Sequence, residues 1–551
     1  MKNNLRKFFV ALLFLALSVH IVTAQQTSAI LSGKILDEKN LPMPGVNVQI
    51  TYLPLKKTSA TVTNEKGAFY VPNLSPGGPY TVKISFIGYK SESKDIASLS
   101  LGANTEMSIQ METENTQIAG VEVVGRSKVR NEGTVIKKEQ LQLLPSTSHS
   151  LTDFTRMTPE ANNNAYAGTN FRYNNVTLDG AVNNDAVGFS NSFGGVSGGG
   201  QSGTAGSGSR SNPYSIDYIE QVQVQISPFD IKQGNFTGGS VNAVTKSGTN
   251  DFKGDIYSFG KQSWMVGKDP GTGKSMSSGF HDGMTGISVS GAIKQNKLFY
   301  FINAEETRRQ DPAFYNAGDA GSPVSLADAQ AIANKLKTTY NYDPGSYGAY
   351  NIQTNSDKIF GRLDYVINDR NSLMVRAIYT HGWGQNLERS TTNFQFGSTD
   401  FTQHTKNLSV IAQLKSTFAN NLYNDVMLSY INVHDYRDFP NPIAPFIDIA
   451  STKIWLGSWR EASVYNTKQS TYEFTDNLTW IKGFNTFTLG THNEFYKIDY
   501  GFLNSYNGRW EYSSIANFLA DKPSRIRSAY PLDNSMNSVS YLNAHPEQIA
   551  S

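Results

Sequence analysis

The sequence predicts a mainly β protein with several domains, and three observations support this prediction. The 551-residue chain has 47 Gly, 28 Tyr and 30 Phe but only 17% charged residues, which favours strands and turns over helices. Its second half contains repeated pairs of strand-like segments separated by short turns. Beyond the amino-terminal leader, no segment has the ~18 consecutive apolar residues of a membrane-spanning helix.

Residues 1–24 have the features of a cleaved signal peptide. Basic residues precede an apolar stretch that is shorter than the ~20 residues of a spanning helix, so a membrane anchor is the weaker interpretation. The small residues Val22 and Ala24 predict cleavage between Ala24 and Gln25. The chain is therefore predicted to be exported.

Charge and reactive residues point to neither a nucleic-acid partner nor an enzyme. The formal net charge of +2 includes three cations of the leader, so the mature chain is close to 2 − 3 = −1 and has no basic stripe. There is no cysteine, and the eight histidines lack metal-ligand spacing. No nucleophile elbow or zinc-protease motif is present. We therefore predict no catalytic residues, no cofactor and no metal.

Residues 27–112 are predicted to form a small β-sandwich, because short strand-like segments alternate with turns rich in Pro, Gly and Asn. The predicted strands are Ala29–Leu36, Val46–Tyr52, Ser59–Val62, Ala68–Val71, Tyr80–Phe86 and Met107–Met111. The segments Gly33–Asp37, Leu41–Val48, Thr63–Phe69 and Ile87–Tyr89 resemble the carboxypeptidase-regulatory-like domain. That resemblance implies a transthyretin-type, immunoglobulin-like domain of the cell envelope.

Residues 219–260 are the most informative passage. An alternating strand, Ile219–Ile226, is followed by a glycine-broken turn, a second strand at Val241–Thr245 and an aromatic third strand. The residues Ile219, Glu220, Gly234, Gly238, Gly239 and Val241–Gly248 resemble the plug-to-barrel junction of TonB-dependent outer-membrane receptors of Bacteroidetes, most closely the Oar-like group. The resemblance implies a periplasmic sandwich, a plug at 127–248 and a barrel in outer-membrane lipid that imports an extracellular ligand.

The plug segment is predicted to be α+β. Lys137–Leu144 and Leu151–Met157 are predicted helices, and Asn174–Gly180 resembles a plug strand of the family that ends in Asp-Gly. Residues 188–208 are almost entirely Gly, Ser, Asn and Thr and cannot bury enough apolar surface to order themselves. They are interpreted as a mobile loop or as a loop that becomes ordered when ligand binds.

Residues 113–126 form a predicted linker with a short β-prone strip. Such a strip can pair with the sheet edge of a partner protein. The family resemblance implies a TonB box here, which would bind the TonB-type energising protein; its candidate residues are Ile118, Val121, Glu122, Val123 and Val124. The strip could instead be the last strand of the sandwich or the first strand of the plug.

Residues 249–551 are predicted to be the first part of an antiparallel transmembrane barrel. Four hairpins are predicted: Thr285–Ile293 with Leu298–Glu306, Ile359–Ile367 with Leu373–His381, Leu408–Ser416 with Tyr423–Val433, and Thr471–Ile481 with Thr486–Tyr496. Arms of about 9–11 residues match the thickness of a bilayer. One arm has Ile359, Leu363 and Tyr365 on one face and Phe360, Arg362 and Asp364 on the other.

Long segments at 310–356 and 435–469 are predicted to be loops on the side opposite the short turns. The first should contain a helix that is capped by Ser325, with Asp328 three residues later. The four hairpins and the single strand near Gly254–Gly260 give nine predicted arms. These fall short of the about 22 strands of plugged transporter barrels, so the chain is expected to be part of a longer receptor.

The predicted function is therefore TonB-dependent outer-membrane transport of an unidentified substrate, with no enzymatic activity. An adhesin or a structural barrel on the same scaffold is the alternative; a functional TonB strip separates the two, because transport needs it and adhesion does not. A hydrolase is disfavoured, because no catalytic constellation accompanies the sandwich.

Overall fold

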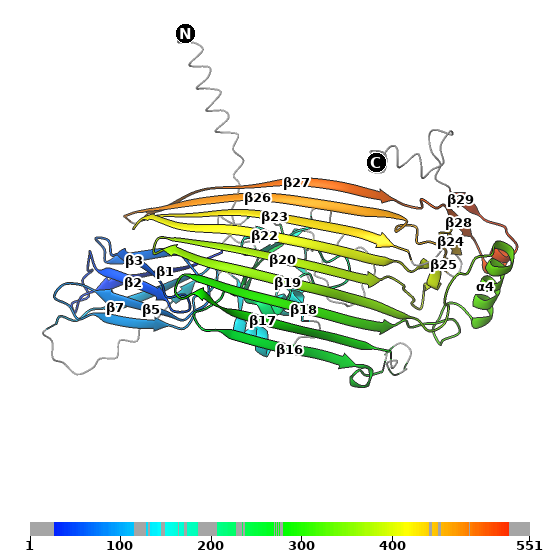
Figure 1. Ribbon diagram of the computed structural model, residues 1–551, viewed down its shortest axis with the longest axis horizontal. Coiled ribbons are helices and arrows are strands. Elements are labelled where there is room, and N and C mark those ends of the chain that lie inside the picture. Colours follow the sequence, from blue (N-terminus) through cyan, green and yellow to red (C-terminus); the bar gives the residue numbers. More distant parts are fainter. Residues whose placement is uncertain are drawn as a thin grey trace, which may run out of the picture.

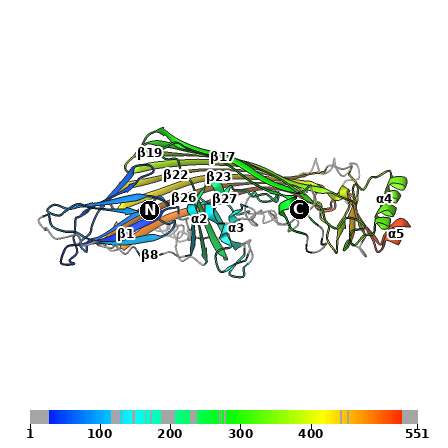
Figure 2. The ribbon, with the colours of Figure 1, turned by 90° about the horizontal axis from the view of Figure 1, so that it is seen from below.

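The computed structural model is elongated, with a β-sandwich at one end, a long curved sheet along its length and a smaller loop region at the other end (Figure 1). A compact domain lies against the concave face of the long sheet (Figure 2). The structure describes residues 27–114, 128–130, 133–144, 149–162, 165–169, 173–185, 206–226, 234, 237–268, 270, 273, 275, 279–439, 443–449, 453–483 and 485–527. Within these ranges, no helix has the length and apolar character needed to cross a membrane.

The sandwich consists of two four-stranded sheets, ordered β4-β1-β7-β8 and β3-β2-β5-β6. Its strands are β1 Ala29–Leu36, β2 Asn47–Tyr52, β3 Lys57–Val62, β4 Ala68–Leu74, β5 Tyr80–Ser85, β6 Glu92–Ile96, β7 Asn104–Gln110 and β8 Lys128–Arg130. Leu31, Val48, Phe69 and Val82 face one another in the core. The sequence did not predict β6, because this edge strand is largely polar and lacks apolar alternation.

The domain on the concave face, which we call the plug, is built on a five-stranded sheet ordered β13-β12-β15-β14-β9. Its elements are β9 Thr134–Lys137, α2 Lys138–Leu143, α3 Leu151–Thr155, β10 Ala161–Asn162, β11 Ala165–Tyr166, β12 Asn175–Leu178, β13 Ala181–Val182, η2 Ile216–Tyr218, β14 Ile219–Ile226 and β15 Gly239–Thr245. The predicted strands at 219–226 and 241–245 are confirmed as β14 and β15. All seven residues of β15 are buried, because the strand lies in the middle of the sheet.

The large sheet contains nine antiparallel strands in the order β16-β17-β18-β19-β20-β22-β23-β26-β27. They are β16 Lys253–Gln262, β17 His281–Lys294, β18 Leu298–Pro312, β19 Asn351–Asn368, β20 Asn371–Gln385, β22 Thr402–Ala419, β23 Leu422–Asp438, β26 Val464–Lys482 and β27 Asn485–Leu503. Among the described residues, β16 and β27 do not pair with each other, so the sheet is open. All four predicted hairpins are present.

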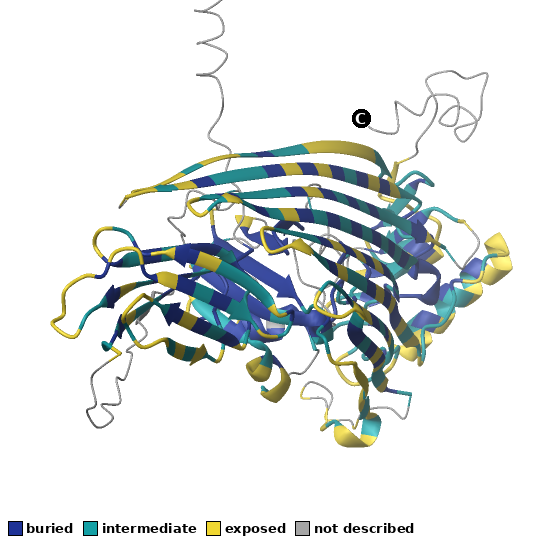
Figure 3. Ribbon diagram, turned by 60° about the vertical axis from the view of Figure 1, so that its left-hand side comes forward, coloured by how far each residue is buried: buried dark blue, intermediate teal, exposed yellow. Residues whose placement is uncertain are grey.

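The predicted arm length of about 9–11 residues was wrong, since the strands after β16 have 14 to 19 residues. The hairpins continue past the apolar segment as polar strands, which the hydrophobic pattern does not reveal. The predicted division into two faces is confirmed: Ile359 is 59% and Leu363 is 45% exposed on the convex face, whereas Phe360 is fully buried on the concave face. Figure 3 shows this alternation as stripes across the sheet.

The long connections gather at the end opposite the sandwich and form a loop domain with its own core (Figure 1). Its elements are α4 Leu326–Tyr340, β21 Phe394–Gln395, η4 Gly397–Thr399, β24 Phe446–Ile449, β25 Ile454–Leu456, β28 Arg509–Tyr512, α5 Ile515–Leu519 and β29 Arg525–Arg527. The predicted cap is confirmed, because the backbone N–H of Asp328 donates to Ser325 Oγ at 3.0 Å. A short helix, η3 Ser263–Met265, follows β16.

Candidate functional site

The plug meets the large sheet at a tight turn between β12 and β13. Asp179 and Gly180 both have positive φ, at 51° and 85°, which is the conformation of a two-residue hairpin turn that favours Asp-Gly. The pairing of Leu178 with Ala181 closes this turn. It directs the buried Asp179 carboxylate toward the wall formed by the large sheet.

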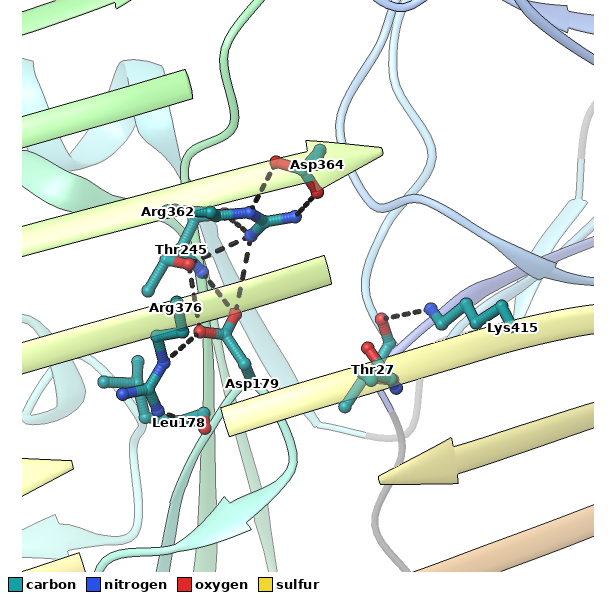
Figure 4. Close-up of polar contacts among 9 residues, drawn as sticks. Thr27, Leu178, Asp179, Thr245, Arg362, Asp364, Arg376 and Lys415 are labelled. Atoms are coloured by element: carbon teal, nitrogen blue, oxygen red, sulfur yellow. Dashed lines mark hydrogen bonds and ion pairs between the residues drawn. The ribbon is translucent and has the colours of Figure 1, made fainter. Parts of the chain in front are cut away.

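Two arginines of the large sheet and one plug threonine surround the Asp179 carboxylate (Figure 4). Arg376 Nε donates to Asp179 Oδ2 at 2.8 Å, and Arg376 Nη2 donates to the Leu178 carbonyl at 3.0 Å. The Thr245 backbone N–H donates to Asp179 Oδ1 at 2.8 Å. Arg362 lies 3.8 Å from the same carboxylate.

Arg362 also connects the plug to the sheet in its own right. Its Nη1 donates to the Thr245 carbonyl at 2.7 Å, while Nε and Nη2 form a bidentate pair with Asp364 at 2.8 Å. We call Asp179, Thr245, Arg362, Asp364 and Arg376 the Asp179 latch. Breaking a buried ion pair on one side leaves an uncompensated charge, at a cost of about 3–5 kcal/mol. This latch therefore holds the plug in one position.

A second latch lies around Glu305 of β18. Lys358 Nζ donates to Glu305 Oε1 at 2.6 Å, and both side chains are at least 98% buried. The Ser215 hydroxyl of the plug donates to Glu305 Oε2, and Tyr257 donates to the same oxygen at 3.1 Å. We call Ser215, Tyr257, Glu305 and Lys358 the Glu305 latch.

Asp217 lies beside this second latch. Burial, followed by the charge of Glu305, raises the pKa of Asp217 to about 6, while Lys246 and Lys358 act in the opposite direction. The Asp217 carboxyl group therefore changes between its neutral and its charged form at a pH of about 6. The plug carries a titratable group at the latch itself.

The plug is also fastened nearer the loop domain. Arg210 Nη2 donates to Glu388 Oε1 at 2.8 Å, and only 8% of the Arg210 side chain is exposed. Thr380 Oγ1 donates to the Pro213 carbonyl at 2.9 Å. A cavity of about 270 Å³ adjoins Arg210, with Phe401, Phe446, Asp448, Trp455, Trp459, Arg460 and Glu461 among its lining residues.

The sandwich contacts both the plug and the large sheet. Gln221 of β14 is 99% buried; its amide donates to the Leu99 carbonyl at 3.1 Å and accepts from the Leu101 N–H at 2.9 Å. At the sheet, Gln413 Nε2 donates to Thr27 Oγ1 at 2.8 Å. Lys415 Nζ lies 3.5 Å from the Thr27 carbonyl, which is also drawn in Figure 4.

Two further contacts reach the ends of sheet strands. Lys57 Nζ donates to Ser372 Oγ at 2.7 Å, and Asn64 Nδ2 donates to the Gly483 carbonyl at 3.3 Å. Between sandwich, plug and sheet lies a cavity of about 590 Å³, which we call the vestibule. Its lining includes Tyr52 and Pro76 of the sandwich, Glu220 and Lys246 of the plug, and Ser290, Arg362, Asp364 and Lys415 of the sheet.

The predicted cleavage residues Ala24 and Gln25 and the predicted strip residues Ile118, Val121, Glu122, Val123 and Val124 lie outside the described residues. The strands that flank the strip are described: β7 and β8 are adjacent and antiparallel in one sheet of the sandwich. Lys128–Arg130, which the sequence assigned to the plug, is thus paired with the sandwich. In the described part of the chain, no group of three or more His, Asp or Glu side chains is arranged to hold a metal ion.

Sequence reasoning missed the two latches. Arg362 and Asp364 were recognised only as members of the polar face of an arm, and Asp179 only as the end of a plug strand. An acidic Asp-Gly turn together with inward-facing arginines was the available signal. Arg376 could not be assigned to Asp179, because 197 positions separate them in the chain.

Comparisons with known proteins agree with this architecture. The family described as "Outer membrane beta barrel domain" matches residues 244–321 and 320–544, which is more than half of the chain. The family described as "Carboxypeptidase regulatory-like domain" matches residues 30–112. A curated relative, the TonB-dependent transporter Oar of Myxococcus xanthus, is 23% identical over 375 residues, which are 62% of this chain and 32% of that protein. The match thus spans about a third of the relative's length.

Two solved structures are also similar. The outer membrane transporter YddB from Escherichia coli has a TM-score of 0.48 and 14% identity, covering 69% of this chain and 50% of that one. The siderophore receptor PirA from Acinetobacter baumannii has a TM-score of 0.44 and 16% identity, covering 67% of this chain and 48% of that one. The chain spans about half the length of each.

Proposed function

The chain belongs to the outer-membrane β-barrel family, and on that premise we propose that it acts in TonB-dependent transport of a substrate across the outer membrane. In this proposal the large sheet is part of the membrane-spanning wall, the plug blocks the passage, and the sandwich lies in the periplasm. The protein transports and does not catalyse.

The observation that carries the proposal is how the plug is held. Its contacts with the wall include the buried, hydrogen-bonded ion pair of Asp179 with Arg376 at one latch and the contact of the Ser215 hydroxyl with Glu305 at the other. Water and displaced polar groups can take over such contacts when the plug shifts. A polar attachment of this kind suits a part that has to move repeatedly, whereas a permanent structural filling would need no charged partners in the wall.

A ligand on the loop side would be linked to the plug through Arg210. This side chain pairs with Glu388, in the connection between β20 and β21, and borders the aromatic cavity near Trp455 and Trp459. Binding there would change the surroundings of a plug residue directly. Such a connection supplies the coupling between an outside site and the plug that gated uptake requires.

The energising partner would act at the strip Ile118–Val124. The path from this strip into the plug is short: β8 forms only three residue pairs with β7, and β9 then follows as the edge strand of the plug sheet. A partner strand that pairs with the strip and pulls would load β8 first and β9 next. Edge strands with few pairs are the ones that open at the lowest free energy.

The test uses substitutions that differ only in backbone chemistry. A Val121→Pro, Val123→Pro receptor loses the N–H groups that a partner strand would pair with, whereas Val121→Ala, Val123→Ala retains them. We expect the proline receptor to lose binding of the periplasmic domain of the TonB-type protein, measured with both components purified, and the alanine receptor to retain it. Equally strong binding by both receptors would place the partner's contact outside the strip, and no binding by either would favour the alternative function of a non-transporting adhesin or structural barrel.

A further inference from the structure

The sandwich is attached across a wide part of the large sheet. Its contacts reach Ser372 at the start of β20, Gln413 of β22 and Gly483 in the turn between β26 and β27. These positions span five neighbouring strands, or about 19 Å at a spacing of ~4.8 Å per strand. The sandwich therefore covers this end of the sheet and does not merely touch it at one point.

The covered space adjoins the Asp179 latch. Asp179, Thr245 and Arg362 of the latch line the vestibule together with Tyr52 and Pro76 of the sandwich. The short turns of the sheet lie at this same end, and the loop domain lies at the opposite end (Figure 1). A solute that passes the latch toward the short turns would enter the vestibule, which the sandwich borders.

The sandwich is seated without sharing a hydrophobic core with its neighbours. Its buried apolar cluster contains only sandwich residues, and the plug cluster contains only residues of the plug and the large sheet. The polar contacts of the seat include hydrogen bonds donated by Lys57, Asn64, Gln221, Asn250, Gln413 and Lys415. Such a domain can leave its seat as one body without opening either core.

We propose that the sandwich is an exit lid: seated as observed, it closes the vestibule, and it leaves its seat as one body when solute has to pass. This inference rests on the proposed transport function, because a lid requires a passage. It gives the sandwich a function of its own, distinct from the function proposed for the strip Ile118–Val124.

Seating is tested first by crosslinking, which is simple because the chain contains no cysteine. The full chain with Lys57→Cys and Ser372→Cys is purified and treated with a short, reducible, thiol-specific crosslinker. The matched control pairs Ser372→Cys with Lys94→Cys, which lies on β6 at the opposite edge of the sheet that contains Lys57, about 14 Å away over three strand spacings. We expect crosslinking of the first pair and not of the control. Equal, low yields from both pairs would overturn the proposal.

Closure is tested next with a permanently charged methanethiosulfonate reagent as the probe. A single cysteine replaces Ser290, which is 94% buried and lines the vestibule. We compare its modification rate in the otherwise unchanged chain with the rate after Lys57→Ala and Asn64→Ala. We expect the rate to rise about tenfold, the factor that corresponds to ~1.4 kcal/mol of lost seating free energy. Asp369→Cys, in the exposed turn between β19 and β20, should react equally in both.

A second receptor carries Ser372→Ala, which removes the Lys57 contact from the other side, and Gln413→Ala, which removes the contact with Thr27. It should show a similar increase, so the test does not depend on the folding of one variant. Unchanged protection of Ser290→Cys in both unfastened receptors would mean that the sandwich closes nothing. Neither experiment contains a TonB-type protein, so a failure of energised transport leaves the result for the lid unaffected. Conversely, a sandwich that closes nothing leaves the strip experiment unaffected.

Discussion

The plug and the sandwich both contact the large sheet, but by different chemistry. The plug is held by the almost fully buried ion pair of Arg376 with Asp179 and by apolar packing, such as the stacking of Tyr218 on Phe360. The sandwich is held by hydrogen bonds of uncharged groups and by those of two lysines, Lys57 with Ser372 and Lys415 with the Thr27 carbonyl. Buried charges are costly to separate one at a time, whereas a neutral hydrogen bond contributes only about 0.5–1.5 kcal/mol. We therefore expect the sandwich to detach from the large sheet before the plug does.

The largest effect is expected for Asp179→Asn. Asparagine tolerates the φ of 51° at this turn, so the change isolates the loss of charge from backbone strain. Arg376, which is fully buried, then lacks its counter-ion, and we expect a loss of about 3–5 kcal/mol in plug stability. Native-state proteolysis in increasing urea measures it. The control Glu306→Gln removes an acid from an exposed ion pair with Arg308 and should cost at most ~1 kcal/mol.

The Glu305 latch is expected to show a smaller effect, because neutral donors remain after the cation is removed. In Lys358→Met, Ser215 and Tyr257 still donate to the Glu305 carboxylate, so we expect a loss of about 2–3 kcal/mol. Adding Glu305→Leu should recover part of this loss, because an apolar pair replaces an isolated buried charge. A double-mutant cycle measures the coupling of Lys358 with Glu305, and purely additive losses would contradict the ion pair that holds the Glu305 carboxylate in this latch.

Gln221→Met sharpens the comparison between the two attachments. Methionine is similar in size but leaves the Leu101 N–H without its partner and removes one of the two donors to the Leu99 carbonyl, which keeps the Gly77 N–H. We expect about 1–2 kcal/mol weaker seating of the sandwich, seen as reduced crosslinking of Lys57→Cys with Ser372→Cys. The plug core itself does not include this side chain, so plug proteolysis should change little. An equal loss in both assays would show that sandwich and plug open as one unit.

The sequence predicted the framework because most strands carry a regular apolar alternation. The arm at 359–365 is the clearest case, since its two faces were assigned correctly. The pattern ended too early along the hairpins, because the outer parts of most strands are polar, as in Thr307–Asp311 of β18, although β27 continues with Ile498 and Phe502. It also failed at β6, where the residues Glu92–Ile96 lack apolar alternation on either face.

The site was less predictable than the fold. Each latch forms where an inward-facing side chain of the large sheet contacts a particular residue of the plug. Strand register and sheet order determine these contacts. The sequence analysis singled out Asp179, Arg362 and Asp364. It could not predict the contact of Asp179 with Arg376, because 197 positions separate the two residues in the chain. The assignment of the strip at 118–124 stays a prediction.

The smallest expected effect is a pH dependence from Asp217, which lies at the Glu305 latch with Lys246, Tyr257 and Lys358 around it. Its pKa in the folded plug is about 6, raised from its ordinary value of 3.8 by burial and then by Glu305. Because the folded pKa lies above the unfolded one, the stabilisation is fully present below pH 3.8 and is lost as the pH rises through 6. We therefore expect the plug to be more resistant to proteolysis at pH 5 than at pH 7.5, by about 1 kcal/mol for this half-buried group. Asp217→Asn should remove the difference and raise the resistance at pH 7.5. If the variant keeps the full pH dependence, another group at the latch is responsible, and the release of the plug does not respond to Asp217.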